Sequence, residues 1–187
     1  MAIGTRDALV QAAESLMRTK GYAAFSYADL ADTIGIKKAS IHHHFPTKED
    51  LGIAIVEEYI ARVRIEFQRI ENVHNDVRGR LNAYVLAFRA SSEGGLLPLC
   101  GALAAEMAAL PSGLQKITHH FFDMQLKWLT SILDDGVAKG ELPKQVKTRH
   151  KAFLLLSVLE GASFINWATK ENDAIGDDII QLIFEEI

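Results

Sequence analysis

Hydrophobic residues recur at helical spacing along nearly the whole chain, and no segment shows the apolar–polar alternation of a strand. In the first segment, Leu9, Ala13 and Met17 fall on one face of a helix. Thr5 is a suitable N-cap for this helix, and Gly21 is a suitable terminator. Because the same pattern continues to the C-terminus, we expect an all-α fold.

Glycine, proline and N-cap residues divide the chain into nine predicted helices, three short and the rest mostly long. The expected helices cover residues 5–20, 26–34, 38–45, 47 to 71–75, 76–92, 98–110, 114–139, 148–169, and a last one that opens at Asp173 or Asp177. The composition changes after Pro46. We therefore expect a three-helix head, residues 1–46, and a six-helix body, residues 47–187.

The stretch from Tyr27 to Phe45 has the pattern of a helix-turn-helix. Ala31 is small where two helices must cross closely, and Gly35 stands where the turn needs a positive φ. Ile41 is one of the apolar positions that would hold the second helix against the first. The outward residues of that second helix are small, polar or cationic, which suits insertion into a major groove of DNA.

The same region resembles the DNA-binding domain of the TetR family. The resemblance rests on GY at 21–22, FSYADLA at 25–31, GIKKASI at 35–41 and HFPTKEDL at 44–51. One position departs from the family pattern, because the family most often has Tyr where this chain has His42. Since His titrates near neutral pH, we expect that contact to differ and DNA binding to be somewhat pH-sensitive.

The resemblance implies a homodimer that binds a palindromic operator in double-stranded DNA, usually as a repressor, and leaves it when a small-molecule effector enters the body. The residues expected at the DNA are Lys37, Lys38, Ala39, Ser40, His42, His43 and His44 in or beside the groove, with Ser26 and Lys48 on phosphate. Residues 1–48 carry six Lys and Arg against four Asp and Glu, although the whole chain has a net charge of −4. A head more basic than the body fits a protein that touches DNA with one end.

The body contains sulfur-bearing and aromatic side chains that predict an effector cavity for an apolar or aromatic molecule. The candidates are Phe88, Cys100, Leu103, Met107, Phe121, Met124, Trp128, Phe164 and Trp167. Each of these residues is equally explained as ordinary core. Cys100 is either an inert buried thiol or a redox sensor near a helix N-terminus.

The last two predicted helices are apolar around most of their circumference, which predicts a dimer interface. The resemblance places both helices at this interface, and the expected residues are Leu155, Leu159, Ala162, Ile180, Ile183 and Phe184. The alternative is that these side chains form the core of a monomer.

Other features of the sequence narrow the class of protein. Three adjacent histidines, 42–44, point about 100° apart on a helix, so they cannot converge on one metal ion. We find no convergent catalytic set, nucleotide loop, signal peptide or membrane-length apolar run. We therefore expect a cytoplasmic protein without cofactor, metal, enzymatic activity or membrane contact. Two alternatives stay open: a helical enzyme or carrier with a vestigial head, and a constitutive DNA-binding protein without an effector.

Overall fold

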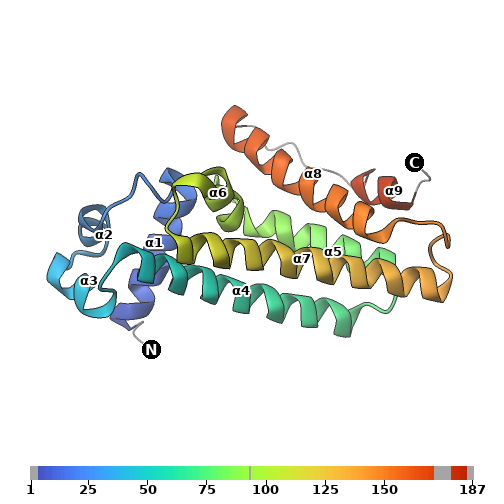
Figure 1. Cartoon of the computed structure of the whole chain (residues 1–187), viewed down its shortest axis with the longest axis horizontal. Coiled ribbons are helices and arrows are strands. Elements are labelled where there is room, and N and C mark those ends of the chain that lie inside the picture. The colour runs from blue at the N-terminus through green and yellow to red at the C-terminus, as the bar shows by residue number, and fades with distance from the viewer. Residues whose placement is uncertain (1–3, 93, 171–177, 185–187) are drawn as a thin grey trace. The chain divides into compact units, whose positions relative to one another are not determined.

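The computed structural model describes residues 4–92, 94–170 and 178–184, and these residues form helices and no strand (Figure 1). The all-α prediction is confirmed. The helices are α1 (Thr5–Lys20), α2 (Tyr27–Ile34), α3 (Lys38–His44), α4 (Lys48–Val73), α5 (Val77–Ser91), α6 (Leu99–Ala105), the 3-10 helix η1 (Met107–Ala109), α7 (Ser112–Lys139), α8 (Thr148–Thr169) and α9 (Asp178–Phe184).

Where both can be compared, the predicted helix boundaries agree to within two residues, except at the end of the sixth predicted helix. Gly4, not Thr5, is the N-cap of α1. The helix expected over 98–110 ends at Ala105 and continues as the 3-10 turn η1. The predicted opening of the last helix at Asp173 or Asp177 lies outside the described residues.

The helices pack into two compact units. The first consists of residues 1–62 and 96–121, and the second of residues 63–95 and 122–187. Both α4 and α7 therefore contribute to each unit. The division after Pro46 stays a prediction, since the packing joins residues 96–121 to the N-terminal helices.

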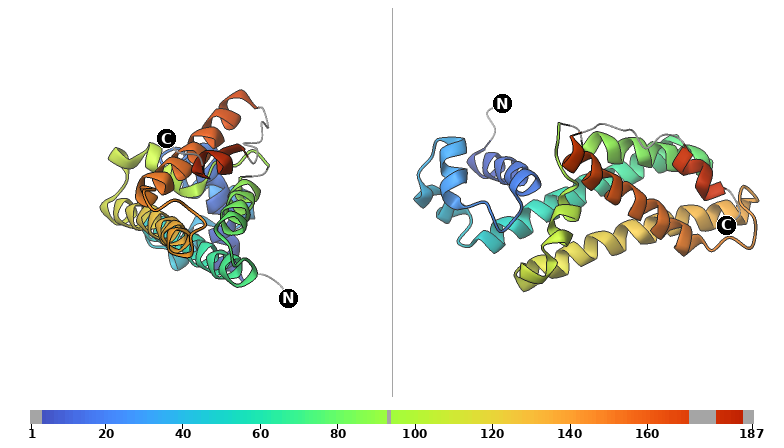
Figure 2. Two further views of the ribbon diagram at one scale, coloured as in Figure 1. Left: turned by 90° about the vertical axis from the view of Figure 1, so that its right-hand side faces the viewer. Right: turned by 90° about the horizontal axis from the view of Figure 1, so that it is seen from above.

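The first unit is built on α1, α2 and α3, which lie together in Figure 1 and in the right-hand view of Figure 2. Of the apolar positions that the sequence pattern indicates, Leu9, Ala13, Met17, Leu30 and Ile41 are buried in it, whereas Leu16, Ile34 and Ile36 are half-buried. Val10, Phe25, Phe45, Leu51 and Ile55 are buried with them. Burial of these side chains is the main force that holds the short helices α2 and α3, because helices this short are unstable alone.

Polar contacts join residues 96–121 to α1 within this unit. The carboxylate of Glu106 accepts hydrogen bonds from the backbone N–H groups of Tyr22 (2.8 Å) and Ala23 (2.7 Å). The buried Arg18 donates through Nε to the carbonyl oxygen of Leu97 at 2.7 Å. Since the turn after α1 leaves amide groups without helical partners, the Glu106 carboxylate satisfies them from a distant part of the chain.

The second unit has a core formed by α4, α5, α7, α8 and α9. Its centre includes Leu81, Tyr84, Leu133, Leu155 and Ile180, all nearly inaccessible to solvent. Helix α9 contacts both α5 and α8. The aromatic rings of Phe67 and Trp128 stack with centroids 3.9 Å apart.

Among the described residues, α8 is the one helix long and apolar enough to span a membrane by length and composition. The helix is not one continuous apolar run, because Arg149, Lys151 and Glu160 lie within it. Much of the helix is nevertheless exposed in the single chain, including Phe153, Val158, Ile165 and Trp167. An exposed apolar helix of this kind needs a covering surface.

We predict that Gly136→Ala destabilises the protein. The added Cβ in α7 would come within 2.3 Å of Val77 Cγ2, a distance that requires the branched Val77 side chain to shift. Overpacking of a core of this type costs about 1–3 kcal/mol. Urea denaturation of the purified protein measures this loss.

The double variant Gly136→Ala/Val77→Ala is the control, because it removes the Val77 Cγ2 atom that the added Cβ would meet. We expect Gly136→Ala to cost less stability when added to Val77→Ala than when added to wild type. Equal losses in the two backgrounds would contradict the packing explanation.

Candidate functional site

The turn between α2 and α3 has the geometry that the sequence predicted. Gly35 adopts a left-handed conformation with φ 74° and ψ 33°. Its N–H and that of Ile36 both donate to the carbonyl oxygen of Ala31, at 2.8 and 3.1 Å. Because a side chain disfavours this conformation, glycine fits here, and α3 can start three residues after α2 ends.

Helix α2 begins with a capping box. The Ser26 hydroxyl accepts from the N–H of Ala28 and Asp29, and the Asp29 carboxylate accepts from the N–H of Ser26 at 2.8 Å. The Ser26 hydroxyl itself donates to Asp29 at 2.6 Å. These bonds, with Lys20 at 3.2 Å from Asp29, lower the pKa of the Asp29 carboxyl to about 2. Ser26 therefore caps α2. Its contact with phosphate stays a prediction.

Helix α3 presents nearly its whole surface to solvent. Ile41 is fully buried, whereas all its other residues are exposed. The exposed residues include six predicted at the groove, namely Lys38, Ala39, Ser40, His42, His43 and His44, and Lys37 is exposed just before the helix. From Gly35 to Lys48 the chain carries three lysines, three histidines and no carboxylate. This exposed, cation-rich helix is suited to bind a polyanion.

His42 turns toward the end of α3. Its Nδ1 lies 3.2 Å from the carbonyl oxygen of Pro46, and its ring contacts the ring of Tyr27 with centroids 4.9 Å apart. The Tyr27 hydroxyl is in hydrogen-bond range of the carbonyl oxygens of Phe45 (2.9 Å) and Thr47 (2.6 Å). Burial, followed by the charge of Asp50, raises the pKa of Tyr27 to about 12. His42 therefore has one ring nitrogen in the α3–α4 turn and only Nε2 left for DNA.

The Lys48 side chain packs against two aromatic rings of the first unit. Its Nζ lies 4.4 Å from the ring centroids of both Tyr22 and Phe25 and 3.5 Å from the carbonyl oxygen of Ala23. Burial lowers the pKa of Lys48, although the charges of Glu106 and Asp29 partly oppose the change. Its predicted contact with phosphate stays a prediction, and would require the ammonium group to extend away from these rings.

The predicted effector residues are divided between the two units. Cys100, Leu103 and Phe121 are buried in the first unit, and Met107 is half-buried there. The second unit holds the other five predicted residues, Phe88, Met124, Trp128, Phe164 and Trp167. Cys100 is completely inaccessible to solvent, which favours the inert thiol over the sensor.

Part of the second-unit set comes together around an aromatic cluster. Trp128 stacks on Phe67 and lies 5.5 Å from the ring of Tyr84, which contacts Phe88. The indole Nε1–H of Trp128 donates to Glu71 at 2.8 Å. Their use in binding an effector stays a prediction, because stacked aromatic residues also serve as ordinary core.

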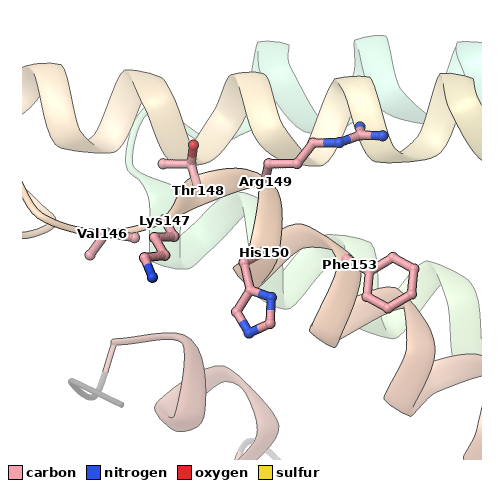
Figure 3. Close-up of a pocket in the computed structure, with 6 residues that line it drawn as sticks. All are labelled: Val146, Lys147, Thr148, Arg149, His150 and Phe153. Carbon is pink, nitrogen blue, oxygen red and sulfur yellow. The ribbon is translucent and has the colours of Figure 1, made fainter.

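Figure 3 shows an open depression of about 530 Å³ at the start of α8. It is lined by Val146, Lys147, Thr148, Arg149, His150 and Phe153. None of the nine predicted effector residues lines it. Its basic character also differs from the apolar pocket that the sequence predicts.

Sequence reasoning missed Glu160, in the middle of α8. Both carboxylate oxygens of Glu160 are buried, and no described residue forms a hydrogen bond with them. Burial raises the pKa of this carboxyl to about 7. The available signal was a single acidic residue within an otherwise apolar helix.

The predicted dimer residues are mostly internal to this chain. Leu155, Leu159, Ile180 and Ile183 lie in the core of the second unit, with exposed fractions of 3% or less. Ala162 and Phe184 are half-buried, and the ring of Phe184 lies under the guanidinium of Arg78 at 4.2 Å. The four core residues therefore offer no area to a partner in this conformation, and dimer contacts would come from other residues of α8.

Comparisons with known proteins agree with the helix-turn-helix. Residues 9–55 match the model of the family described as bacterial regulatory proteins, tetR family. The chain is 27% identical over 180 residues to a nucleoid occlusion factor, SlmA, of Marinobacter nauticus, covering 90% of each chain. It is 27% identical over 145 residues to the HTH-type transcriptional regulator CymR of Pseudomonas putida, covering 75% of this chain and 71% of that one.

Solved structures extend the similarity to the whole fold. A TetR transcriptional regulator from Legionella pneumophila superposes with a TM-score of 0.84 at 25% identity, covering 97% of this chain and 94% of that one. The similarity therefore includes the body as well as the head.

We predict that Glu160→Gln changes how stability depends on pH. The folded-state pKa of about 7 lies above the ordinary value of 4.5, so the folded protein holds this proton more tightly than the unfolded chain. Wild-type stability should fall as pH rises from 4.5 through 7, by about 3 kcal/mol in all. The amide variant lacks this loss, which urea denaturation at pH 5 and pH 8 would reveal.

Glu66→Gln is the control, because it removes the same charge from a carboxylate of the same unit whose pKa its partner Arg69 lowers. It should not gain stability over wild type at pH 8. If Glu160→Gln and wild type lost equal stability between the two pH values, the Glu160 carboxyl would not be buried without a partner.

Proposed function

This chain belongs to the TetR family of bacterial regulatory proteins, and from that premise we propose that it represses transcription as a dimer that a small molecule releases from DNA. The family consists of transcriptional regulators, and the whole fold agrees with that assignment. The observation that carries the proposal is the exposed, carboxylate-free surface of α3, anchored by a single buried side chain, Ile41.

The proposed DNA contact uses α3 as the recognition helix. Ala39 and Ser40 are small and exposed, so they permit close approach to base edges. Lys37 and Lys38 provide charge for bases or phosphates beside them. Because one head covers one half-site, two heads would occupy major grooves about one helical turn apart on a palindrome.

The proposed dimer forms through an exposed stripe of α8, defined by Leu154, Val158, Gly161 and Ile165. These positions are four, three and four residues apart, so they share one face of the helix. Val158 and Ile165 are 41% and 64% exposed, and Leu154 is half-buried. Nothing lies within 4 Å of a Cβ placed at Gly161, so a partner helix could approach closely there.

The proposed switch is a shift between two populations. An effector that binds better to a conformation unable to fit the operator would draw the protein away from DNA. Residues 96–121 belong to the same compact unit as the recognition helix, and Glu106 fixes the turn after α1. Movement of these residues, together with that of α4, is the proposed route from effector to head.

A constitutive DNA-binding protein without an effector is the remaining alternative. The two proposals differ in one observable, the release of DNA by a small molecule. A protein that stays bound to its operator in the presence of every ligand that it binds would be constitutive.

We predict that selection from a random duplex library recovers a palindrome with half-sites about one turn apart. Binding to this sequence should weaken steeply as salt rises, because counterions are released from phosphate. Lys38→Gln should weaken binding and, because the dimer carries two copies of Lys38, reduce the slope of log K against log salt by about 2 if Lys38 contacts phosphate. Fluorescence anisotropy at several salt concentrations measures both quantities.

Lys144→Gln is the matched control, since Lys144 is an exposed lysine of the second unit. We expect it to leave affinity and slope unchanged. Recovery of no sequence motif, with only weak salt-sensitive binding, would refute the proposed regulator.

We predict that Ile165→Glu converts the dimer to monomers. A charged side chain in a packed apolar interface costs several kcal/mol without a partner. Sedimentation velocity at micromolar concentration measures the change in mass.

Ile65→Glu is the control for this variant, because Ile65 of α4 is 66% exposed, nearly the same as Ile165. It should remain dimeric. A dimer that survives Ile165→Glu would place the subunit contact elsewhere.

A further inference from the structure

The buried carboxylate of Glu160 has no partner among the described residues. Both of its oxygens are inaccessible to solvent, and this burial raises its pKa. A buried carboxylate without a hydrogen bond is costly, and such groups in proteins nearly always have partners. A partner from outside the described residues would remove this cost.

Three aromatic residues of α8 share a stripe with Glu160, and we call this set the Glu160 stripe. Phe153, Phe164 and Trp167 lie seven residues before, four after and seven after Glu160, so all project within about 40° of it around the helix. Phe153 is 57% exposed, Trp167 is 48% exposed, and Phe164 is half-buried. The buried carboxylate is therefore flanked along the helix by aromatic surface that solvent can reach.

The Glu160 stripe differs from the proposed dimer stripe. Val158 and Ile165 lie about 160° and 140° around the helix from Glu160. A subunit packed on that face would leave the aromatic rings of the Glu160 stripe uncovered. The stripe is therefore available to a ligand when the dimer has formed.

Carboxylate and aromatic rings together select for a cation. The negative charge attracts an ammonium group, and the faces of Phe and Trp bind cations with about 0.5–2 kcal/mol each. Arg149, a basic residue on the same side of the helix, lies roughly 16 Å away along the axis, so it is too far along the helix to pair with Glu160. An anionic ligand would be repelled by the ionised carboxylate.

We propose that the Glu160 stripe binds the effector and that the effector is an organic cation, an amine attached to an aromatic or apolar body. Because both Glu160 oxygens are inaccessible in the free chain, the side chain turns outward on binding, and its carboxylate then accepts hydrogen bonds from the ammonium group while Phe164 and Trp167 contact the apolar body. This inference rests on the proposed function, since it assigns the ligand that the regulator senses. Two of its residues, Phe164 and Trp167, were also expected from the sequence to line the effector site.

The test is calorimetric titration of the full chain, without DNA, at pH 8, where the Glu160 carboxyl with its pKa of about 7 is mostly ionised. The probes are 1-naphthylmethylammonium and its neutral analogue of the same shape, 1-naphthylmethanol. Wild type should bind the cation about tenfold or more tightly than the alcohol. Glu160→Gln should lose about tenfold in affinity for the cation while its affinity for the alcohol changes little.

Two further variants test whether the affinity for the cation depends on this carboxylate and on this aromatic ring. Glu66→Gln removes a half-buried carboxylate that is paired with Arg69 in the same unit and should leave the affinity for the cation unchanged. Trp167→Leu should weaken cation binding severalfold, since it removes a π face but keeps apolar volume.

Several results would overturn the proposal. These are equal affinity of wild type for both probes, absence of cation binding at about 1 mM, or unchanged cation affinity in Glu160→Gln. A dimer dissociation constant altered about tenfold in Glu160→Gln would also do so, because it would place the carboxylate in the subunit contact. Operator binding by wild type is measured separately, so a protein that binds its palindrome but not the cation refutes this inference and leaves the regulator intact.

Discussion

The anchoring of α3 through Ile41 is the constraint on which the rest of the structure depends. A helix of seven residues has little stability of its own, yet a recognition helix must expose nearly all of its surface. The structure meets both demands with one fully buried side chain and with fixed ends. Gly35 sets the turn before α3, and Tyr27 reaches the carbonyl oxygens of the turn after it. Most of the exposed residues of α3 are thus left for the proposed contact with DNA, whereas His42 also contacts Tyr27 and the carbonyl oxygen of Pro46.

A second dependence links that helix to the body of the chain. The Glu106 carboxylate holds the amides of Tyr22 and Ala23, and Gly21 beside them has a φ of 87° and would collide with Glu106 if it carried a Cβ. In the same unit, Glu49 of α4 accepts from the N–H of Gly113 at the start of α7 at 2.9 Å. Charge-assisted bonds to backbone are strong and directional. A displacement of residues 96–121 would therefore act on the head through fixed bonds.

The sequence predicted most of the fold and the recognition helix, because both depend on local patterns. Gly35 and the apolar position Ile41 identify the helix-turn-helix without knowledge of the rest of the chain. The end of α6 at Ala105 could not be predicted from the sequence, because the Glu106 carboxylate binds the backbone N–H groups of Tyr22 and Ala23. These residues are more than eighty positions earlier in the chain. Likewise, α8 is apolar around most of its circumference, so its pattern did not reveal which side faces the core. Leu155 and Leu159 face the core, and Val158 and Ile165, on another side of the helix, are exposed.

The three sides of α8 explain why a single acidic residue is retained in it. One side packs in the core through Leu155 and Leu159, and the stripe through Val158 and Ile165 offers apolar area to a second subunit. Neither surface can accept a charge without a penalty, and Glu160 lies on the third side of the helix, where its oxygens are buried and have no hydrogen-bond partner among the described residues. A group in this position makes the free protein less stable than an amide would. That cost is removed when a cation pairs with the carboxylate. A cationic ligand therefore binds more tightly to a conformation in which the Glu160 carboxylate is buried without a partner than to one in which it is not. Such differential affinity is what a ligand needs in order to shift a population, and a plain apolar pocket of equal size in both conformations would not provide it.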